Sequence, residues 1–239
     1  SVQWSVSQKE GMPTSKLEEL MWLSETTVDR ERERVPLGNV LSQCKAHMLK
    51  FPTVPSFKAA IMSSPGALCV PQLQKTDAQG SIRPRYDVSS LASSFSSSLA
   101  LALNVSPDWG GSLDDLSLLP FADTPVLATS LVLYPYQIYR ARLSGAHAIT
   151  LLPAALQEKD LGYLSRISRQ IGLEVYVVVN SARQIGKVSA QVDGVIVDNR
   201  DWSDYKSPKD GGRALGVLRS AEFGAFVEGQ EERPAVIVQ

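Results

Sequence analysis

The stretch PVLATSLVLYPYQIYRARLSGAHAI, residues 125–149, decides the fold of this chain. Its first part, Val126 to Leu133, is an apolar run rich in β-branched residues, which is typical of a buried strand. The segment QIYRARLSG that follows has helix length and ends on a glycine suited to a helix C-terminus. A further apolar run begins at HAI. A strand followed directly by a helix and another strand indicates a βαβ unit.

The same alternation continues over most of the chain after residue 67. We expect strands in the apolar runs at residues 67–70, 99–105, 125–133, 147–152, 173–180, 194–198, 224–228 and 235–238. These runs are nearly continuous, as in a parallel sheet covered on both faces. Eight candidate strands separated by helix-length segments predict an α/β fold of the (β/α)8 TIM-barrel type rather than an open doubly wound sheet. Neither a GxGxxG dinucleotide motif nor a P-loop is present.

The two ends of the chain add detail to this prediction. Apolar residues at helical spacing in residues 15–34 and 36–51 predict two helices. We therefore expect a helical N-terminal extension over residues 1–55 and a barrel domain over residues 56–239. The segment between the last two expected strands is too short for an ordinary crossover helix. The last βα unit is thus expected to be shortened or irregular.

Composition excludes several classes of function. The chain has 239 residues, with 24 basic and 25 acidic side chains, and no long basic run. Nucleic-acid or anionic-membrane binding therefore has no electrostatic support, and the apolar runs are shorter than the ~20 residues of a membrane span. Cys44 and Cys69 are isolated and only two histidines are present. We expect both thiols to be reduced packing residues, and we expect neither a metal site nor a cofactor.

An ordered series of motifs resembles the indole-3-glycerol phosphate synthase family. These barrel enzymes decarboxylate and ring-close an anilino sugar phosphate in tryptophan biosynthesis. The resemblance is strongest at PVL and YPYQIYRARLSGAHAI, and it continues at SIRPRYD (81–87), GGSLDDL (110–116), GLEVYVVVN (172–180) and DNRDW (198–202). The N-terminal helices are similar to those of plant and algal plastid members. That similarity, with a first residue other than Met, leads us to expect a plastid (chloroplast) protein.

The resemblance also implies which positions carry the chemistry, and these positions have changed. The family's general acid is a lysine at the end of the third strand, where Thr129 stands. The glutamate base of the fifth strand falls on Val178. The glutamate and lysine of the first strand are counted onto Pro71 and Leu73. Because none of these residues changes protonation state near neutral pH, the family reaction is expected to be lost.

Polar residues remain at other positions that the resemblance assigns to the pocket. This expected relict pocket consists of Ser112, Asp198, Asn199, Glu228 and Gly229. Asp198 and Glu228 form either an acidic pair in the pocket, or caps of the adjacent loops and partners of Arg200. Ser112 is expected to form a turn and a helix N-cap. Glu231 and Glu232 lie where the family holds a phosphate, so a small phosphate ligand is not expected.

Two hypotheses of function follow from the resemblance. In the first, the chain is a catalytically inactive barrel that serves as a structural or docking subunit, with other protein subunits of a larger plastid assembly as its partners. In the second, it is an active indole-3-glycerol phosphate synthase, or a related phosphosugar lyase, with relocated catalytic groups. Lys75 or Asp77, a few residues beyond the first strand, would then supply the missing acid.

Overall fold

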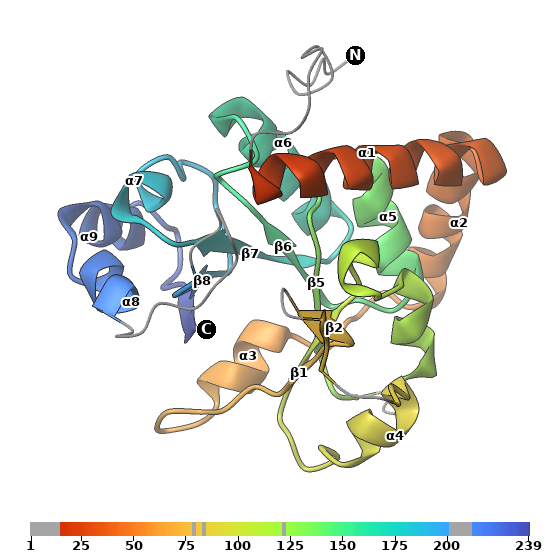
Figure 1. Cartoon of the computed structure of the whole chain (residues 1–239), viewed down its shortest axis with the longest axis horizontal. Helices are drawn as coiled ribbons and strands as arrows, with labels where there is room; N and C mark the ends of the chain where they lie inside the picture. Colours follow the sequence, from red (N-terminus) through yellow and green to blue (C-terminus); the bar gives the residue numbers. More distant parts are fainter. Residues whose placement is uncertain (1–14, 78–79, 83–84, 121–122, 201–211) are drawn as a thin grey trace.

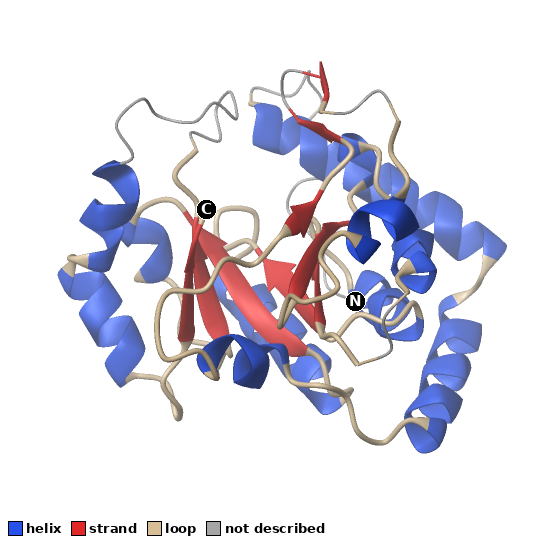
Figure 2. Ribbon diagram, turned by 90° about the horizontal axis from the view of Figure 1, so that it is seen from below, coloured by secondary structure: helices blue, strands red, loops and turns tan. Residues whose placement is uncertain are grey.

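A curled parallel sheet lies at the centre of the molecule and helices cover its outside (Figures 1 and 2). The computed structural model describes residues 15–77, 80–82, 85–120, 123–200 and 212–239. In this part of the chain the sheet has seven strands in the order β1-β4-β5-β6-β7-β8-β9. Each neighbouring pair is parallel. This sequential order of parallel strands with crossover helices is that of a (β/α)8 barrel, as expected from the sequence.

The strands of this sheet are short, and all but β9, at one edge, are buried or half-buried over most of their length. They are β1 (Gln72–Leu73), β4 (Leu101–Asn104), β5 (Val126–Thr129), β6 (Ala148–Leu151), β7 (Glu174–Val179), β8 (Gly194–Val197) and β9 (Ala235–Val238). A separate antiparallel hairpin of β2 (Thr76–Asp77) and β3 (Gly80–Ser81) follows β1.

Helices connect the strands and precede them. They are α1 (Lys16–Arg34), α2 (Leu37–Lys50), α3 (Phe57–Met62), α4 (Val88–Ser93), α5 (Pro135–Leu143), α6 (Glu158–Gln170), α7 (Ala182–Ile185), α8 (Gly212–Leu218) and α9 (Ala221–Glu228). Two short 3₁₀ helices, η1 (Pro107–Trp109) and η2 (Leu113–Leu118), connect β4 to β5.

Side chains of the strands alternate between two apolar clusters. The larger cluster lies between the sheet and the outer helices and includes Leu73, Leu103 and Val177. The smaller cluster fills the interior of the curled sheet and includes Leu127 and Tyr176. Because successive side chains of a strand point to opposite faces, every second residue faces the interior. This alternation shows which side chains at the strand ends face the interior and which face the outer helices.

Helix α3 closes the interior at the end where the strands begin. Its first residue, Phe57, packs edge-on against Tyr176, with ring centroids 5.3 Å apart. Glu174, at the start of β7, accepts hydrogen bonds from the Ser56 hydroxyl and, at 2.7 Å, from the Lys58 backbone N–H. Helix α3 therefore covers the interior at the amino-terminal ends of the strands.

The N-terminal helices α1 and α2 lie against α5 and the loop that follows β5. The Tyr134 hydroxyl donates to Glu25 Oε1 at 2.7 Å, and the Arg32 guanidinium lies 4.8 Å from the centre of the Tyr134 ring. The Tyr136 hydroxyl donates to the Val35 carbonyl oxygen at 3.0 Å. The predicted N-terminal helices are confirmed, while the boundary at residue 55 stays a prediction.

One predicted strand is wrong: residues 224–228 belong to helix α9. The Ser220 side chain caps this helix by accepting from the Phe223 N–H at 3.2 Å. Phe226 is buried, and Phe223 and Val227 pack partly buried beside the core, which is helical spacing rather than alternation. Residues 235–238 are consequently the seventh strand of the sheet, where the sequence predicts the eighth.

A second correction concerns the first strand. The sequence predicts it at residues 67–70, whereas β1 is Gln72–Leu73. Pro71 lies directly before β1, where its carbonyl accepts from the Ala102 N–H at 2.9 Å. A proline contributes no N–H to a ladder, and the strand is only two residues long. Cys69 is exposed, contrary to the expectation that both cysteines are packing residues, while Cys44 is buried as expected.

Candidate functional site

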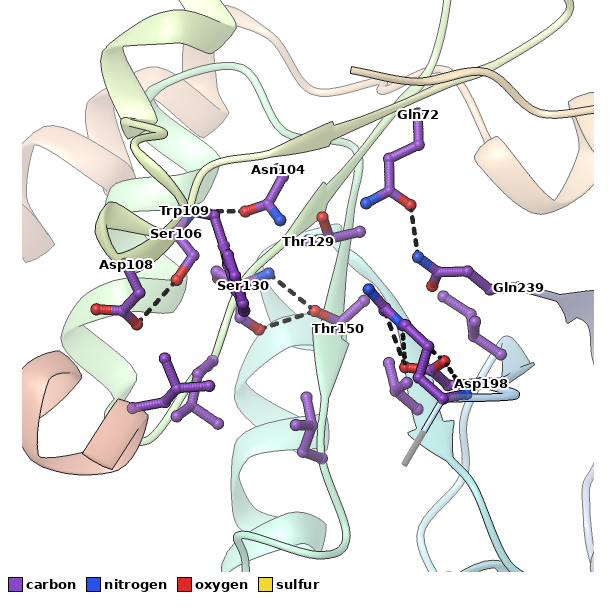
Figure 3. A pocket seen from close by; sticks show the side chains of 16 residues that line it. Gln72, Asn104, Ser106, Asp108, Trp109, Thr129, Ser130, Thr150, Asp198 and Gln239 are labelled. Carbon is purple, nitrogen blue, oxygen red and sulfur yellow. Dashed lines mark hydrogen bonds and ion pairs between the residues drawn. The ribbon is translucent and has the colours of Figure 1, made fainter. Parts of the chain in front are cut away.

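The cavity at the carboxyl ends of the strands is small. Its volume is about 100 Å³, and strand ends from the whole sheet contribute to its wall (Figure 3). Its polar lining residues are Gln72, Asn104, Ser106, Asp108, Thr129, Ser130, Thr150, Asp198, Arg200 and Gln239. Its apolar lining residues are Leu20, Trp109, Leu131, Leu152, Val178 and Ile196. In barrels this is the face at which catalytic groups gather, so this cavity is the candidate site.

The hydroxyls of two lining residues, Thr129 and Thr150, form hydrogen bonds with the backbone. The Thr129 hydroxyl donates to the Leu103 carbonyl oxygen at 3.4 Å. The Thr150 hydroxyl donates to the Ser130 carbonyl oxygen at 2.9 Å and accepts from the Ser130 N–H at 3.1 Å (Figure 3). These bonds tie the end of β6 to the end of β5. None of these side chains has a pKa that would let it exchange a proton near pH 7.

Asp198 and Arg200 form the charged pair of the cavity. The Asp198 carboxylate is 2 % exposed and receives bonds from Arg200 Nε to Oδ1 and from Arg200 Nη2 to Oδ2, both at 2.9 Å. The Arg200 backbone N–H donates to the same Oδ1 at 2.9 Å. This bidentate contact neutralises the carboxylate inside the barrel mouth.

The loop after β4 places a second carboxylate at the rim. Asn104 Oδ1 accepts from the Ser106 N–H at 3.0 Å, and the Ser106 hydroxyl donates to Asp108 Oδ2 at 3.2 Å (Figure 3). The other oxygen of Asp108 is buried and accepts no hydrogen bond within the described chain. Burial raises the pKa of the Asp108 carboxyl above its ordinary value, and the Ser106 hydrogen bond opposes this shift. Burial of Asp108 therefore favours the protonated form of its carboxyl.

Two predicted site residues line the cavity as the sequence analysis requires. Thr129 lies at the end of β5, and Val178 faces the interior from β7 beside the apolar cluster. Asp198 also lines the cavity, and its expected pairing with Arg200 is confirmed. The ends of β5, β7 and β8 therefore bring these three predicted positions to one cavity.

The count along the first strand is wrong by one residue. Leu73 belongs to the outer apolar cluster, and by the alternation of side chains Pro71 points the same way. Gln72 faces the interior and lines the cavity instead. Its Oε1 accepts from Gln239 Nε2 at 3.0 Å, and its Nε2 donates to Gln74 Oε1 at 3.0 Å. An uncharged amide therefore occupies the place where the resemblance expects a charged side chain.

The remaining members of the predicted relict pocket lie elsewhere. The Ser112 side chain caps η2 by accepting from the Asp114 N–H at 3.1 Å, as expected of an N-cap. Asn199 Oδ1 accepts from the Ala214 N–H at 3.1 Å and so holds the first turn of α8. Glu228 is the last residue of α9 and Gly229 is its C-cap, so neither reaches the cavity. Of the two alternatives for Asp198 and Glu228, the acidic pair in the pocket is not found, because residues 224–228 are helical, whereas Asp198 pairs with Arg200.

Sequence reasoning missed Asp108, Asn104 and Gln239 as lining residues. The signal for Asp108 is the segment Ser-Pro-Asp-Trp directly after an apolar run, which is typical of a tight turn at a strand end. The sequence gives no signal for Gln239, because it follows residues 235–238, which are predicted as the eighth strand and are the seventh.

Within the described residues, no group of three or more His, Cys, Asp or Glu side chains is arranged to hold a metal ion. No described helix is both long and apolar enough to cross a membrane.

A family model and the similar curated proteins described next carry the same family name. A sequence model of the family "Indole-3-glycerol phosphate synthase" matches residues 17–216. The indole-3-glycerol phosphate synthase of Rippkaea orientalis is 31% identical over 244 residues, which cover 94% of this chain and 82% of that protein. The protein of the same name from Crocosphaera subtropica is 31% identical over 214 residues, or 86% of this chain and 71% of that protein.

Solved structures of the tryptophan synthase α-subunit of Pyrococcus furiosus are similar at lower identity. One is 14% identical and covers 72% of this chain and 86% of that chain, with a TM-score of 0.43. A chain of the a2b2 complex from the same organism is 13% identical and covers 72% of this chain and 87% of that chain, with a TM-score of 0.41.

Proposed function

Because the chain belongs to the indole-3-glycerol phosphate synthase family, we propose that it keeps the family's barrel as a folded body without the family's proton-transfer chemistry. It serves as a structural or docking subunit of a larger protein assembly, and its place is the plastid. One observation carries the proposal. The interior-facing residues at the ends of β1, β5 and β7 are Gln72, Thr129 and Val178, none of which can donate or accept a proton at neutral pH.

In this proposal the chain lacks both the general acid and the general base of the family reaction, which have to act together. A positioned general acid or base typically contributes ~10²–10⁴ to a rate, so replacing an acid and its partner base removes most of the acceleration. Among the described residues that line the cavity, none is a lysine or a glutamate. The Asp198 carboxylate is neutralised by Arg200.

The size of the cavity supports the same proposal. Pockets that bind small organic molecules usually have volumes of ~300–1,000 Å³. The cavity at the barrel mouth is about 100 Å³. An anilino sugar phosphate would therefore enter only after the Asp198–Arg200 pair or the η1 loop moved.

A second function has an observation in its favour. Two relatives at 31% identity are named indole-3-glycerol phosphate synthase. Asp108, with its raised pKa and one oxygen free of hydrogen bonds, is an alternative acid at the rim of the same cavity. In this candidate function the chain is an active synthase whose acid comes from the loop after β4 instead of the end of β5.

A growth test and a binding test on the same protein distinguish the two functions. The chain is expressed in a bacterial strain that lacks indole-3-glycerol phosphate synthase, with the Rippkaea orientalis protein as the positive control. We expect no growth without tryptophan, and no heat of binding when the purified chain is titrated with the anilino sugar phosphate. Growth that is lost in the Asp108→Asn variant would overturn the proposal and establish the second function.

The assembly is tested on the native protein. We expect the chain to elute from a native plastid extract at a mass well above its own 26.0 kDa and to carry other polypeptides through a second purification step. Elution as a free monomer would remove the support for a docking subunit.

A further inference from the structure

A second cavity lies among the helices, away from the barrel mouth. The end of α2, residues 51–54, Arg142 of α5 and the end of α6 line this helix cavity, which shares no lining residue with the cavity at the mouth. Helix α2 lies beside α5, which in turn contacts α6 (Figure 1). The volume of the helix cavity is about 670 Å³. Pockets that bind small organic molecules usually have volumes of ~300–1,000 Å³, so this cavity has the size of a ligand site.

Most of the wall of the helix cavity is apolar. Its apolar lining residues are Met48, Leu49, Phe51, Pro52, Val54 and Ile171. Leu49 is 86% exposed and Phe51 is 47% exposed. Removing apolar surface from water is favourable, so an apolar group that covers these side chains is stabilised there. The wall therefore favours a ligand with an apolar body.

A buried arginine gives the cavity positive charge. Arg142 is 4% exposed and lines the cavity. Its Nε donates to the Ile171 carbonyl oxygen at 3.0 Å, and its Nη2 donates to the Phe51 carbonyl oxygen at 3.2 Å. Phe51 and Ile171 are the C-caps of α2 and α6, so the guanidinium ties two helix ends together. Within the described residues no carboxylate pairs with Arg142 and its Nη1 has no hydrogen-bond partner, which leaves donors for an anion.

Two exposed cations belong to the same wall. Lys45 of α2 and Arg169 of α6 line the cavity, and neither forms an ion pair with a described residue. None of the described lining residues is acidic. Positive charge also acts on His47 nearby, where burial first, and then Arg142 and Lys50, lower the pKa of the imidazole. Because like charges around one cavity repel each other unless an anion lies between them, the helix cavity is complementary to negative charge.

We propose that the helix cavity binds a small organic anion with an apolar body, of the class of aryl and acyl carboxylates. The carboxylate lies between Lys45 and Arg169 and accepts from Nη1 of Arg142, in charge-assisted hydrogen bonds. The apolar body packs against Met48 and Phe51. Such a site lies outside the barrel interior and does not depend on the chemistry at the mouth.

Titration calorimetry with a matched pair of probes tests the role of charge. The probe 1-naphthoate carries a carboxylate on an aromatic body, and 1-naphthylmethanol has the same body with a neutral alcohol. We expect 1-naphthoate to bind at least about tenfold more tightly than the alcohol, because only the anion forms charge-assisted hydrogen bonds. Decanoate is titrated as the acyl counterpart, and binding of either carboxylate supports the proposed class. No heat with both carboxylates, or equal affinity for 1-naphthoate and its alcohol, would overturn the proposal.

Charge variants locate the site. Lys45→Gln/Arg169→Gln removes two exposed cations from the cavity and keeps Arg142, whose loss would free two helix ends. Binding of the carboxylate should weaken at least about tenfold. The matched control, Arg183→Gln/Lys187→Gln, removes two exposed cations at α7 and should leave the affinity unchanged. Unchanged affinity in the first variant would overturn the assignment of the site to the helix cavity.

A charge added at the rim gives an independent test. Leu49 is mostly exposed, so Leu49→Glu and Leu49→Gln should both fold, which circular dichroism checks. The new carboxylate lies beside the cations and competes with the ligand for them, so Leu49→Glu should bind at least about fivefold more weakly than Leu49→Gln. Equal affinity in the two variants would contradict an anion held at this cavity.

Discussion

The Arg200 guanidinium holds the Asp198 carboxylate through two hydrogen bonds of 2.9 Å at the mouth of the barrel. The carboxylate is almost fully buried, while 28% of the arginine side chain is exposed. Two residues apart in the sequence, they place opposite charges in the cavity at the ends of the strands. Because the carboxylate is buried, we expect this pair to contribute to the stability of the fold.

Breaking this pair should destabilise the protein. Arg200→Ala leaves a buried carboxylate without its cation, and we expect the free energy of unfolding to fall by about 3 kcal/mol. The double variant Asp198→Asn/Arg200→Ala should recover part of the loss, because the uncompensated charge is gone. Urea unfolding at pH 7 measures both.

The control for this experiment is the ion pair between Lys58 and Glu232, where the Glu232 side chain is 82% exposed. Glu232→Gln should leave the urea midpoint unchanged, since exposed pairs contribute little. Equal losses for the buried and the exposed pair would show that Arg200 does not stabilise Asp198 in solution.

Much of the fold could be predicted because the central strands are buried on both faces. The runs that contain β4, β5, β6, β7 and β8 are continuous apolar segments, and the structure confirms each of them. The strand predicted at residues 224–228 is wrong because a five-residue apolar run does not distinguish a strand from the buried face of a helix. Ser220, as an N-cap, was the signal that favoured the helix.

The site could be predicted only where the strand register was certain. Thr129 and Val178 follow long apolar runs, so counting along them succeeds. The segment around Pro71 offers no such run, and an error of one residue turns Gln72 from the outer face to the inner one. Asp108 enters the cavity from a loop, whose path depends on tertiary contacts that periodicity does not describe.

The interior of the barrel allows no side chain at position 194. A Cβ on Gly194 would lie 2.2 Å from Tyr176 Cε1 and 2.8 Å from the Ala235 carbonyl oxygen. Gly194→Ala should therefore cost at least about 3 kcal/mol of unfolding free energy, because the Tyr176 ring is fully buried and cannot move aside without strain. Thermal and urea unfolding measure this loss.

Gly216 in α8 is the matched control, since a Cβ there meets nothing within 4 Å. Gly216→Ala should be neutral, or should stabilise by up to about 1 kcal/mol through the helix preference of alanine. A similar loss at both positions would contradict the packing assigned to Tyr176.

His147 should make the stability depend on pH. Burial, with a smaller contribution from Arg142, lowers the pKa of this imidazole to about 4 in the folded protein, and its Nδ1 accepts from the Val126 N–H at 3.1 Å. The unfolded chain, with a histidine pKa of about 6.5, binds the proton first as the pH falls. The contribution of His147 is thus complete above pH ~6.5 and is lost toward pH ~4, with a slope of at most about 1.4 kcal/mol per pH unit.

The measurement is urea unfolding at several pH values between 7 and 4 for the unaltered chain and for His147→Gln. The difference in unfolding free energy between the two proteins should shrink as the pH falls through this window. His47→Gln serves as the comparison, because His47 is the only other histidine. A difference that stays constant from pH 7 to pH 4 would show that His147 is not held neutral.

A lysine introduced at the end of β5 should not produce the synthase reaction. In Thr129→Lys the ammonium would enter the mouth beside Val178 and Gln72, neither of which offers the carboxylate needed as a base. The cavity of about 100 Å³ also leaves little room for substrate. We expect no product above the buffer rate when formation of indole-3-glycerol phosphate is followed by the fluorescence of its indole ring. We also expect a lower melting temperature, because a desolvated charge replaces a hydroxyl. Thr129→Met, of similar length without the charge, should lose less stability. Turnover by the single lysine variant would mean that a working base already stands in the cavity, and Asp108→Asn in that background would identify it.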